Sequence, residues 1–249
     1  MPYPIEFAPG LVVQRVRPPL LLDAYKLIAF DMDSTLINIE CIDEIADAAG
    51  RRAEVAAITE AAMRGEIADY KDSLRRRVAL LAGVREEFLA QVYRERLRLN
   101  PGARELTQVC KAAGLKLLLV SGGFTYFTDR VRDQLGFDFT RSNVLEVKEG
   151  MLTGKLVDQP WGDICDGAEK RRMLLQTCES LGIAPARAIA VGDGANDLPM
   201  MGEAGLSVAW HAKPAVRAQA KVSIESGGLD RLLEIFPDAI HLGSSGGKT

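Results

Sequence analysis

The stretch Leu27–Glu40, LIAFDMDSTLINIE, places four apolar residues directly before two aspartates that are one residue apart. A continuous apolar run of this length is typical of a strand that is buried on both faces. Two carboxylates so close together repel each other unless one is protonated or a cation lies between them. The stretch therefore predicts a buried strand whose carboxyl end carries a charged site, at Asp31 and Asp33.

Further apolar runs along the chain have the same strand-like character, and helical patterns lie between them. The runs cover 115–120, 188–191, 206–210 and a short 222–224, and the helical patterns cover 104–113, 125–135, 168–181 and 198–204. Strands that alternate with helices predict an α/β fold with a Rossmann-like parallel sheet, covered by helices on both faces. In such sheets, ligands bind beyond the carboxyl ends of the strands.

Polar or small residues follow three of these strands directly. Asp31 follows the first run, Ser121 and Gly122 follow the second, and Asp193 follows the third, with Asp197 four residues later. With Asp33, the second aspartate of the opening stretch, we expect four carboxylates at one rim of the sheet. Such a cluster needs a hard divalent cation, and an all-oxygen ligand set favours Mg²⁺. The alternative is local: an aspartate turn after a strand and an acidic helix N-cap.

The two aspartates of the opening stretch fit complementary roles in catalysis. A carboxylate held at a strand end can attack phosphorus and form an aspartyl-phosphate, which makes Asp31 the candidate nucleophile. Asp33 is the candidate acid/base, because a protonated neighbour can donate to the leaving oxygen and later accept a proton from water. Like charges side by side are then tolerable, because one of them carries a proton or a cation neutralises both.

Three segments depart from the alternation of strands and helices. The segment at 41–99 is rich in Ala, Arg and Glu with no strand-like run, and predicts an inserted helical-bundle cap. The segment at 143–158 alternates apolar and polar residues around Glu149-Gly150 and predicts a small β-hairpin within the core. The segment at 1–25 contains five prolines and predicts an irregular extension with a short edge strand at 11–16. The expected division is an extension at 1–25, a core at 26–40 and 100–249, a cap at 41–99 and a hairpin at 143–158.

Composition and charge exclude several classes of protein. The chain has 249 residues and a formal net charge of -3, which argues against nucleic acid or an anionic membrane as the main partner. It has neither an apolar run near the ~20 residues that span a bilayer nor a signal-peptide start. Four cysteines without CxxC spacing predict buried free thiols and a reducing cytoplasm. The terminal GGKT lacks the first glycine of a P-loop and a following helix.

Four motifs carry a family resemblance. The chain resembles the haloacid dehalogenase-like phosphatases in the order and spacing of four motifs: DMDST at 31–35, SGG at 121–123, Lys170, and GDGAND at 192–197. Within that group, the chain resembles the phosphoserine phosphatase family in the stretches ECIDEIADAAG at 40–50, AMRGE, SLRRRV and VSGGF. The resemblance covers Lys26 to about Phe236 and implies Mg²⁺-dependent hydrolysis of O-phospho-L-serine, the last step of serine biosynthesis. The first 25 residues are shorter than the regulatory domain of some members, so we expect no feedback control of that kind.

The resemblance also implies roles at the phosphate end of the site. Mg²⁺ would be held by Asp31, the backbone carbonyl of Asp33, and Asp193, with Asp197 in support. Ser121 and Gly122, which follow the predicted strand at 115–120, would bind phosphate oxygens. Lys170 would neutralise the phosphate and the nucleophile. Taken alone, this lysine within EKRR would be read as part of a solvated helix face, and only the order of the motifs gives it a role at the site.

At the amino-acid end, the resemblance implies that Glu40 meets the substrate ammonium, Arg77 its carboxylate, and that Asn196 lies against the substrate. The position of Arg77 also follows from helical spacing, because it falls within the apolar stripe formed by Tyr70, Leu74, Val78 and Leu81. An arginine on an apolar face needs an anionic partner, either a substrate carboxylate or an acid within the cap. Glu40 alone would be an ordinary acid at a helix start.

Two other functions are compatible with these residues. A phosphotransferase would form the same aspartyl-phosphate and pass the phosphoryl group to an alcohol such as homoserine, since the cap decides which acceptor enters. A Mg²⁺-binding regulatory module would have lost turnover, but the intact aspartate and lysine motifs argue against it. The oligomeric state does not follow from the sequence.

Overall fold

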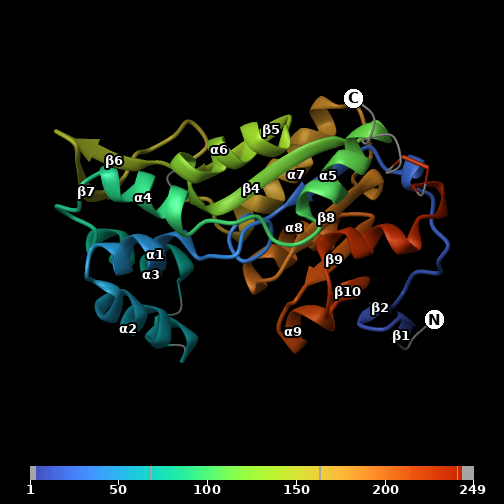
Figure 1. The fold of residues 1–249 in the computed structure, drawn as a ribbon, viewed down its shortest axis with the longest axis horizontal. Helices are drawn as coiled ribbons and strands as arrows, with labels where there is room; N and C mark the ends of the chain where they lie inside the picture. Colours follow the sequence, from blue (N-terminus) through green and yellow to red (C-terminus); the bar gives the residue numbers. More distant parts are fainter. Residues whose placement is uncertain (1–3, 65, 68, 163, 240, 243–249) are drawn as a thin grey trace.

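The computed structural model describes residues 4–64, 66–67, 69–162, 164–239 and 241–242. Within these residues, an eight-stranded sheet has the order β1-β2-β10-β9-β8-β3-β4-β5, and a two-stranded sheet pairs β6 with β7 (Figure 1). All neighbours from β10 to β5 are parallel. The strands are β1 (Ile5–Ala8), β2 (Leu11–Val13), β3 (Leu27–Phe30), β4 (Lys116–Phe124), β5 (Phe139–Asn143), β6 (Leu145–Lys148), β7 (Met151–Leu156), β8 (Ala188–Gly192), β9 (Leu206–Trp210) and β10 (Val222–Ile224).

Helices connect the strands and cover both faces of the sheet. The α-helices are α1 (Cys41–Ala48), α2 (Arg52–Met63), α3 (Tyr70–Ala79), α4 (Glu87–Glu95), α5 (Ala103–Ala112), α6 (Thr125–Leu135), α7 (Gly167–Ser180), α8 (Leu198–Glu203) and α9 (Pro214–Arg217). Short 3₁₀ turns are η1 (Leu22–Ala24), η2 (Pro185–Arg187), η3 (Ala195–Asp197), η4 (Leu229–Ile235) and η5 (Pro237–Ala239). None of the helices in the described ranges is long and apolar enough to cross a membrane.

The strand β3 shows why its sequence is continuously apolar. Ile28 and Phe30 pack in a cluster with residues of α5 and α6, whereas Leu27 and Ala29 pack in a second cluster with residues of α7 and α8. Every residue of β3 is therefore buried, because successive side chains point to opposite faces and both faces are covered. The predicted α/β class with a mostly parallel, doubly covered sheet is confirmed.

The register of the sheet brings three strand ends together. Phe30 of β3 is paired with Leu119 of β4 on one side and with Val191 of β8 on the other. The backbone amide of Asp31 continues this pairing and donates to the carbonyl of Val191 over 3.0 Å. Because these strands are parallel, the residues that follow them meet at one rim of the sheet.

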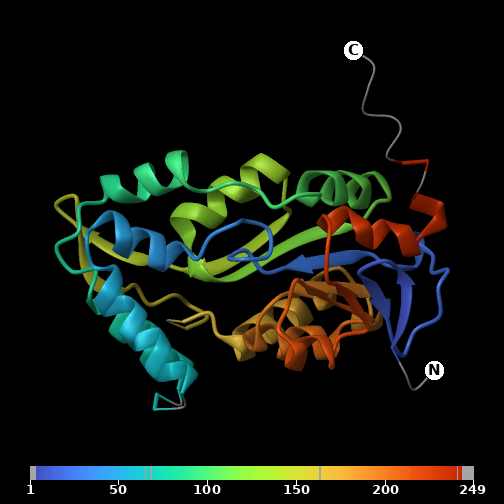
Figure 2. The ribbon, with the colours of Figure 1, turned by 60° about the horizontal axis from the view of Figure 1, so that its bottom comes forward.

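The helices α1 to α4, here termed the cap, lie at the end of the molecule opposite β1 and β2 (Figure 2). The hairpin β6–β7 turns at Glu149 and Gly150, whose φ angles of 51° and 73° suit the tight turn that joins antiparallel strands. The sequence pattern assigned this hairpin to the core. In the structure its Leu152 exchanges backbone hydrogen bonds of 2.8 Å with Gly83 and Val84, so the hairpin lies against the loop between α3 and α4.

Two features of the sheet differ from the prediction. The expected edge strand at 11–16 is shorter, at Leu11–Val13, and it is not at the edge, because β1 pairs with its outer side and β10 with its inner side. The edge strand β5 was not predicted, since its sequence FTRSN has one apolar residue and no strand pattern. The tail GGKT at 246–249 lies outside the described residues.

Candidate active site

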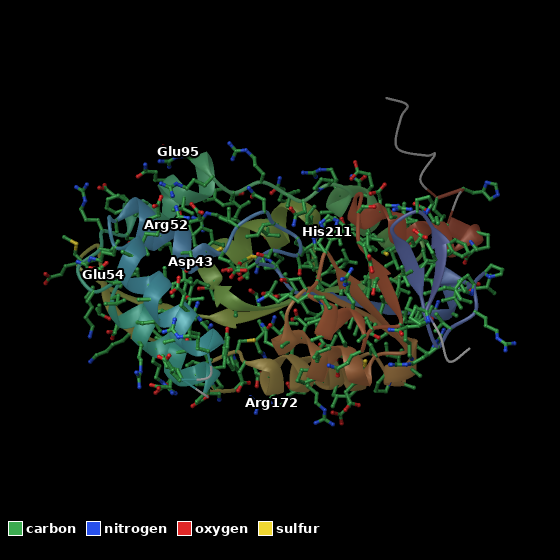
Figure 3. All side chains as sticks on the ribbon, turned by 90° about the horizontal axis from the view of Figure 1, so that it is seen from below. Asp43, Arg52, Glu54, Glu95, Arg172 and His211 are labelled. Carbon is green, nitrogen blue, oxygen red and sulfur yellow. The ribbon has the colours of Figure 1, made fainter. Side chains whose placement is uncertain are left out.

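A cavity of about 560 Å³ lies where the rim of the sheet meets the cap. Eight of the ten residues predicted for the site line it: Asp31, Asp33, Glu40, Arg77, Ser121, Gly122, Asp193 and Asn196. The other two, Lys170 and Asp197, are completely buried, and Lys170 bonds both Asp197 and Asp31. Neither histidine is among the described residues that line the cavity, and His211 is an exposed residue after β9, away from the cap (Figure 3).

The buried ammonium of Lys170 joins two carboxylates. Its Nζ lies 2.7 Å from Oδ1 of Asp31 and 2.7 Å from Oδ1 of Asp197. Burial lowers the pKa of Lys170, but the two carboxylates have the opposite and larger effect, so the pKa is raised and the side chain stays charged. The alternative interpretation of Lys170 as a solvated helix lysine is therefore wrong, because the side chain is 0% exposed.

Asp31 presents one oxygen to this lysine and keeps the other available. Its Oδ1 also accepts a 2.7 Å hydrogen bond from the backbone amide of Met32. Among the described residues, no donor is bonded to Oδ2, and the side chain lines the cavity. These contacts fix the carboxylate while leaving an unbonded oxygen, which is the arrangement that a carboxylate nucleophile requires.

Asp197 holds the loop after β8 in place. Its Oδ2 accepts backbone hydrogen bonds from Asp193 (3.1 Å) and Gly194 (2.9 Å), while Oδ1 is bonded to Lys170. Gly192 permits this close approach, since a Cβ at that position would lie 2.4 Å from the Asp197 carboxyl carbon. Both oxygens of Asp197 are thus already engaged within the protein.

One carboxylate oxygen from each of Asp31, Asp193 and Asp197 lies within 4.8 Å of the other two. Burial, followed by the charge of Asp197, raises the pKa of Asp31 well above its ordinary value and that of Asp193 to about 6. Three carboxylates against one lysine leave an excess of negative charge in a buried place. All-oxygen donors with this excess fit a hard divalent cation such as Mg²⁺. Thr35 supports the cluster by donating a 2.8 Å hydrogen bond to Oδ1 of Asp193.

Asp33 lies at the entrance to the cap, against the start of α1. Its Oδ2 accepts a 2.9 Å hydrogen bond from the backbone amide of Cys41, and its Oδ1 lies 3.2 Å from the Cys41 thiol. Burial, and after it the charge of Glu40, raises the pKa of Asp33 to about 7. A carboxyl group with a pKa near neutrality can donate and accept a proton in the same turnover.

The carboxyl end of β4, at Ser121–Gly123, offers a hydroxyl and close backbone to the cavity. The backbone amide of Gly123 donates to Oγ of Ser121 over 2.9 Å, so the hydroxyl hydrogen remains able to donate to an anion. The buried Asn143 fixes this end of β4 by donating to the carbonyl of Gly122 over 2.7 Å. A Cβ on Gly122 would lie 2.3 Å from the Tyr70 hydroxyl, so only glycine fits under the cap helix α3.

The cap contributes charged groups from α1 and α3. Arg77 is half-buried and lines the cavity, whereas Arg75 and Arg76 are exposed, as the helical stripe predicted. Among the described residues, no acid forms an ion pair with Arg77, and its Nε is buried without a hydrogen-bond partner. Glu40 is exposed at the cavity and accepts a 2.6 Å hydrogen bond from Ser34. The alternative of an internal salt bridge for Arg77 is not what these contacts show.

Sequence reasoning missed several residues at this site. Thr35 and Asn143 act on predicted residues through hydrogen bonds, and nothing in their local sequence indicates those partners. Tyr70 was recognised only as a member of the apolar stripe. Asp43 lines the cavity from α1, and its spacing of three residues from Glu40 was a usable signal, since such residues share a helix face.

Comparison with known proteins agrees with this geometry. Residues 25–205 match the family model described as haloacid dehalogenase-like hydrolase. The chain belongs to this family. Its haloacid dehalogenase-like fold therefore agrees with the resemblance that the four motifs indicated.

Individual members of the family are similar over nearly the whole chain. A phosphoserine phosphatase of Albidiferax ferrireducens is 74% identical over 94% of this chain and 99% of its own length. A solved phospho-aspartyl intermediate analogue of phosphoserine phosphatase has a TM-score of 0.77 at 38% identity, over 85% of this chain and 99% of that one. A substrate-bound phosphoserine phosphatase complex has the same TM-score and identity, over 85% and 98%.

Proposed function

We propose that this chain is a Mg²⁺-dependent phosphoserine phosphatase, which hydrolyses O-phospho-L-serine to L-serine and phosphate in the last step of serine biosynthesis. The observation that carries the proposal is the cavity itself. Within the part of the chain that the structure describes, it has an aspartate with an unbonded oxygen on the core side and an arginine without an ion pair beside acidic groups on the cap side. The substrate has the complementary groups, a phosphate at one end and an ammonium and carboxylate at the other. The 74% identity to a phosphoserine phosphatase supports the same substrate.

In the first step, Oδ2 of Asp31 attacks phosphorus and an aspartyl-phosphate forms as the bond from phosphorus to the serine oxygen breaks. Asp33, protonated at the start, donates its proton to the departing serine oxygen. Lys170 keeps Oδ1 of Asp31 bonded and supplies positive charge beside the phosphoryl group. The relative solved as a phospho-aspartyl intermediate analogue supports this covalent route.

In the second step, water attacks the phosphorus of the aspartyl-phosphate and releases inorganic phosphate and the free carboxylate of Asp31. Asp33 accepts the proton of that water, which returns both residues to their starting states. Ser121 and the backbone of Gly122 bind phosphate oxygens through both steps, because a hydroxyl hydrogen and close backbone remain available there.

Asp31, the backbone carbonyl of Asp33, and Asp193 would hold Mg²⁺, with Asp197 supporting them through the loop amides. When bound, the ion supplies positive charge against which the phosphoryl group and the attacking carboxylate can approach each other. Thr35 orients Asp193 for this role.

The cap recognises the amino-acid part of the substrate. Arg77 would bind the carboxylate through two parallel hydrogen bonds, Glu40 would bind the ammonium, and Asn196 would lie against the substrate from the core side. Under this proposal the chain needs no macromolecular partner, and its four buried free thiols fit a reducing cytoplasm.

The proposal is tested with a panel of phosphomonoesters scored by release of inorganic phosphate. We expect O-phospho-L-serine to have the highest kcat/KM, activity to depend on Mg²⁺ and to stop in EDTA, and Asp31→Asn to abolish it. Homoserine in the assay distinguishes the alternative, because a phosphotransferase would form O-phosphohomoserine at the expense of free phosphate. A wild-type chain that bound Mg²⁺ without releasing phosphate from any ester would instead be a non-catalytic module.

A further inference from the structure

The cap side of the cavity holds two buried polar atoms that lack any partner. Across the described residues, Oδ1 of Asp43 and Nε of Arg77 are the buried side-chain nitrogen or oxygen atoms without a hydrogen bond. Both residues line the same cavity. Leaving a buried charged group unbonded costs free energy, so two such atoms of opposite charge in one cavity indicate a ligand with complementary charges.

Asp43 lies beside Glu40 on the first cap helix. Glu40 is the N-cap of α1 and Asp43 is three residues later, so the two side chains are on the same helix face, about 5–6 Å apart at their Cβ atoms. Figure 3 labels Asp43 where the cap helices approach the core. Both carboxylates line the cavity, so a group placed between them would meet two negative charges.

The two carboxylates differ in how available they are. One oxygen of Glu40 already accepts the hydroxyl hydrogen of Ser34 over 2.6 Å. The residue keeps contact with solvent, but burial raises the pKa of its carboxyl group, so its charge is partly shielded as well. Asp43 is half-buried, and its Oδ1 is shielded from solvent and unbonded. Hydrogen bonds to a shielded charged oxygen are stronger than those at an exposed one. Across the described residues, Asp43 thus has a shielded oxygen that no donor bonds, whereas one oxygen of Glu40 is already bonded to Ser34.

Arg77 is near Asp43 but does not satisfy it. Burial raises the pKa of Asp43, and the positive charge of Arg77 acts in the opposite direction, so the two groups are neighbours. They nevertheless form no ion pair within 4.0 Å, and each retains an unbonded buried atom. An arginine and an aspartate held close but apart are suited to binding the two ends of a zwitterion.

We propose that Asp43 is a specificity-determining residue, which binds the α-ammonium group of the substrate together with Glu40 while Arg77 binds the α-carboxylate. An ammonium group has three donors, and two carboxylates on one helix face satisfy more of them than one carboxylate does. This inference rests on the proposed function, and it makes the cap a reader of the amino-acid zwitterion. Phosphomonoesters without an ammonium group leave Asp43 unpaired and are poor substrates for that reason.

The test uses Asp43→Asn with three phosphomonoesters that differ in one charged group each. O-Phospho-L-serine carries both groups, O-phosphoethanolamine lacks the carboxylate, and O-phospho-3-hydroxypropionate lacks the ammonium. We expect Asp43→Asn to lower kcat/KM at least tenfold for the two esters with an ammonium, and less than threefold for the third. Arg77→Ala should give the complementary pattern and spare O-phosphoethanolamine.

A matched control is Glu44→Gln, which removes the same charge from the same helix at the adjacent position. Glu44 points to Arg96 at 2.7 Å and does not line the cavity, so all three kcat/KM values should stay within twofold of wild type. Unfolding temperatures of all variants establish that they fold. As a readout apart from turnover, L-serine should raise the unfolding temperature of wild type but not of Asp43→Asn, whereas inorganic phosphate should stabilise both.

Three outcomes would overturn the inference. Equal losses on all esters would make Asp43 a structural residue, and no loss would remove it from recognition. Losses confined to the two esters with a carboxylate would show that Asp43 acts by positioning Arg77. A wild-type chain without preference for O-phospho-L-serine would instead contradict the proposed function, which is a separate result.

Discussion

Replacement of Lys170 by methionine tests whether the site is built around a buried charge. The Lys170→Met variant keeps most of the side-chain volume but removes the ammonium that lies 2.7 Å from both Asp31 and Asp197. The three side chains are 0%, 8% and 0% exposed, so neither carboxylate can be rehydrated without opening the core. Removing one partner of a buried ion pair costs about 3–5 kcal/mol. Since domains are stable by only about 5–15 kcal/mol, this is a large share of the total.

The measurement is urea unfolding in EDTA, with Lys116→Met as the matched control. Lys116 also lies 2.7 Å from a carboxylate, that of Asp138, but its side chain is 50% exposed. Exposed pairs contribute at most about 1 kcal/mol, so the two variants isolate burial as the cause of the difference. Combining Lys170→Met with Asp197→Asn removes one of the two uncompensated charges. The double variant should therefore be more stable than the sum of the single losses predicts, by about 1 kcal/mol or more.

The reasoning fails if Lys170→Met and Lys116→Met lose equal stability. That result would mean that the buried carboxylates are already protonated in the metal-free protein and need no ammonium. It would also weaken the role of Lys170 in neutralising the phosphoryl group, since the charge would not be held where the chemistry needs it.

Three further predictions concern recognition, protonation and the metal. Arg77→Ala should lower kcat/KM for O-phospho-L-serine about 100-fold, because two charge-assisted hydrogen bonds of about 1.5 kcal/mol each are lost, and should leave an aryl phosphate within threefold. Arg76→Ala, on the exposed face of the same helix, should change neither, and equal losses on both substrates would make Arg77 structural. In EDTA, the unfolding temperature should fall as pH rises from 5 to 8: the pKa values of Asp33 and Asp193, about 7 and 6 when folded against 3.8 ordinarily, mean that the folded state holds protons that the unfolded chain has lost. Saturating Mg²⁺ should flatten that slope, and a slope of opposite sign would contradict the buried-carboxylate description. Thr35→Val should weaken Mg²⁺ binding about 10- to 100-fold in calorimetry, since it removes the hydrogen bond that orients Asp193, and unchanged affinity would show that this bond is dispensable.

The sequence alone determined those features that depend on neighbouring residues. A continuous apolar run at 27–30, ended by Asp31, already specifies a strand buried on both faces with a charged end. Helical spacing separated Arg77 from Arg75 and Arg76, because period 3.6 decides which side of a helix a residue occupies. The turn at Glu149-Gly150 was equally local. In each case the physical cause acts within one turn or one strand.

Only the tertiary structure decided what depends on distant parts of the chain meeting. The sequence gives Lys170 no sign of burial, and the lysine becomes a catalytic candidate by geometry only when α7 packs against the sheet and brings it to Asp31. The turn of the hairpin β6–β7 could be predicted from neighbouring residues. Its contact with the loop between α3 and α4 could not, because it joins residues far apart in the sequence. Likewise, Asp43 is an ordinary acid near a helix start until α3 places Arg77 near it in the same cavity. Side-chain partners over long sequence separations depend on how elements pack, and periodicity within one element carries no information about that packing.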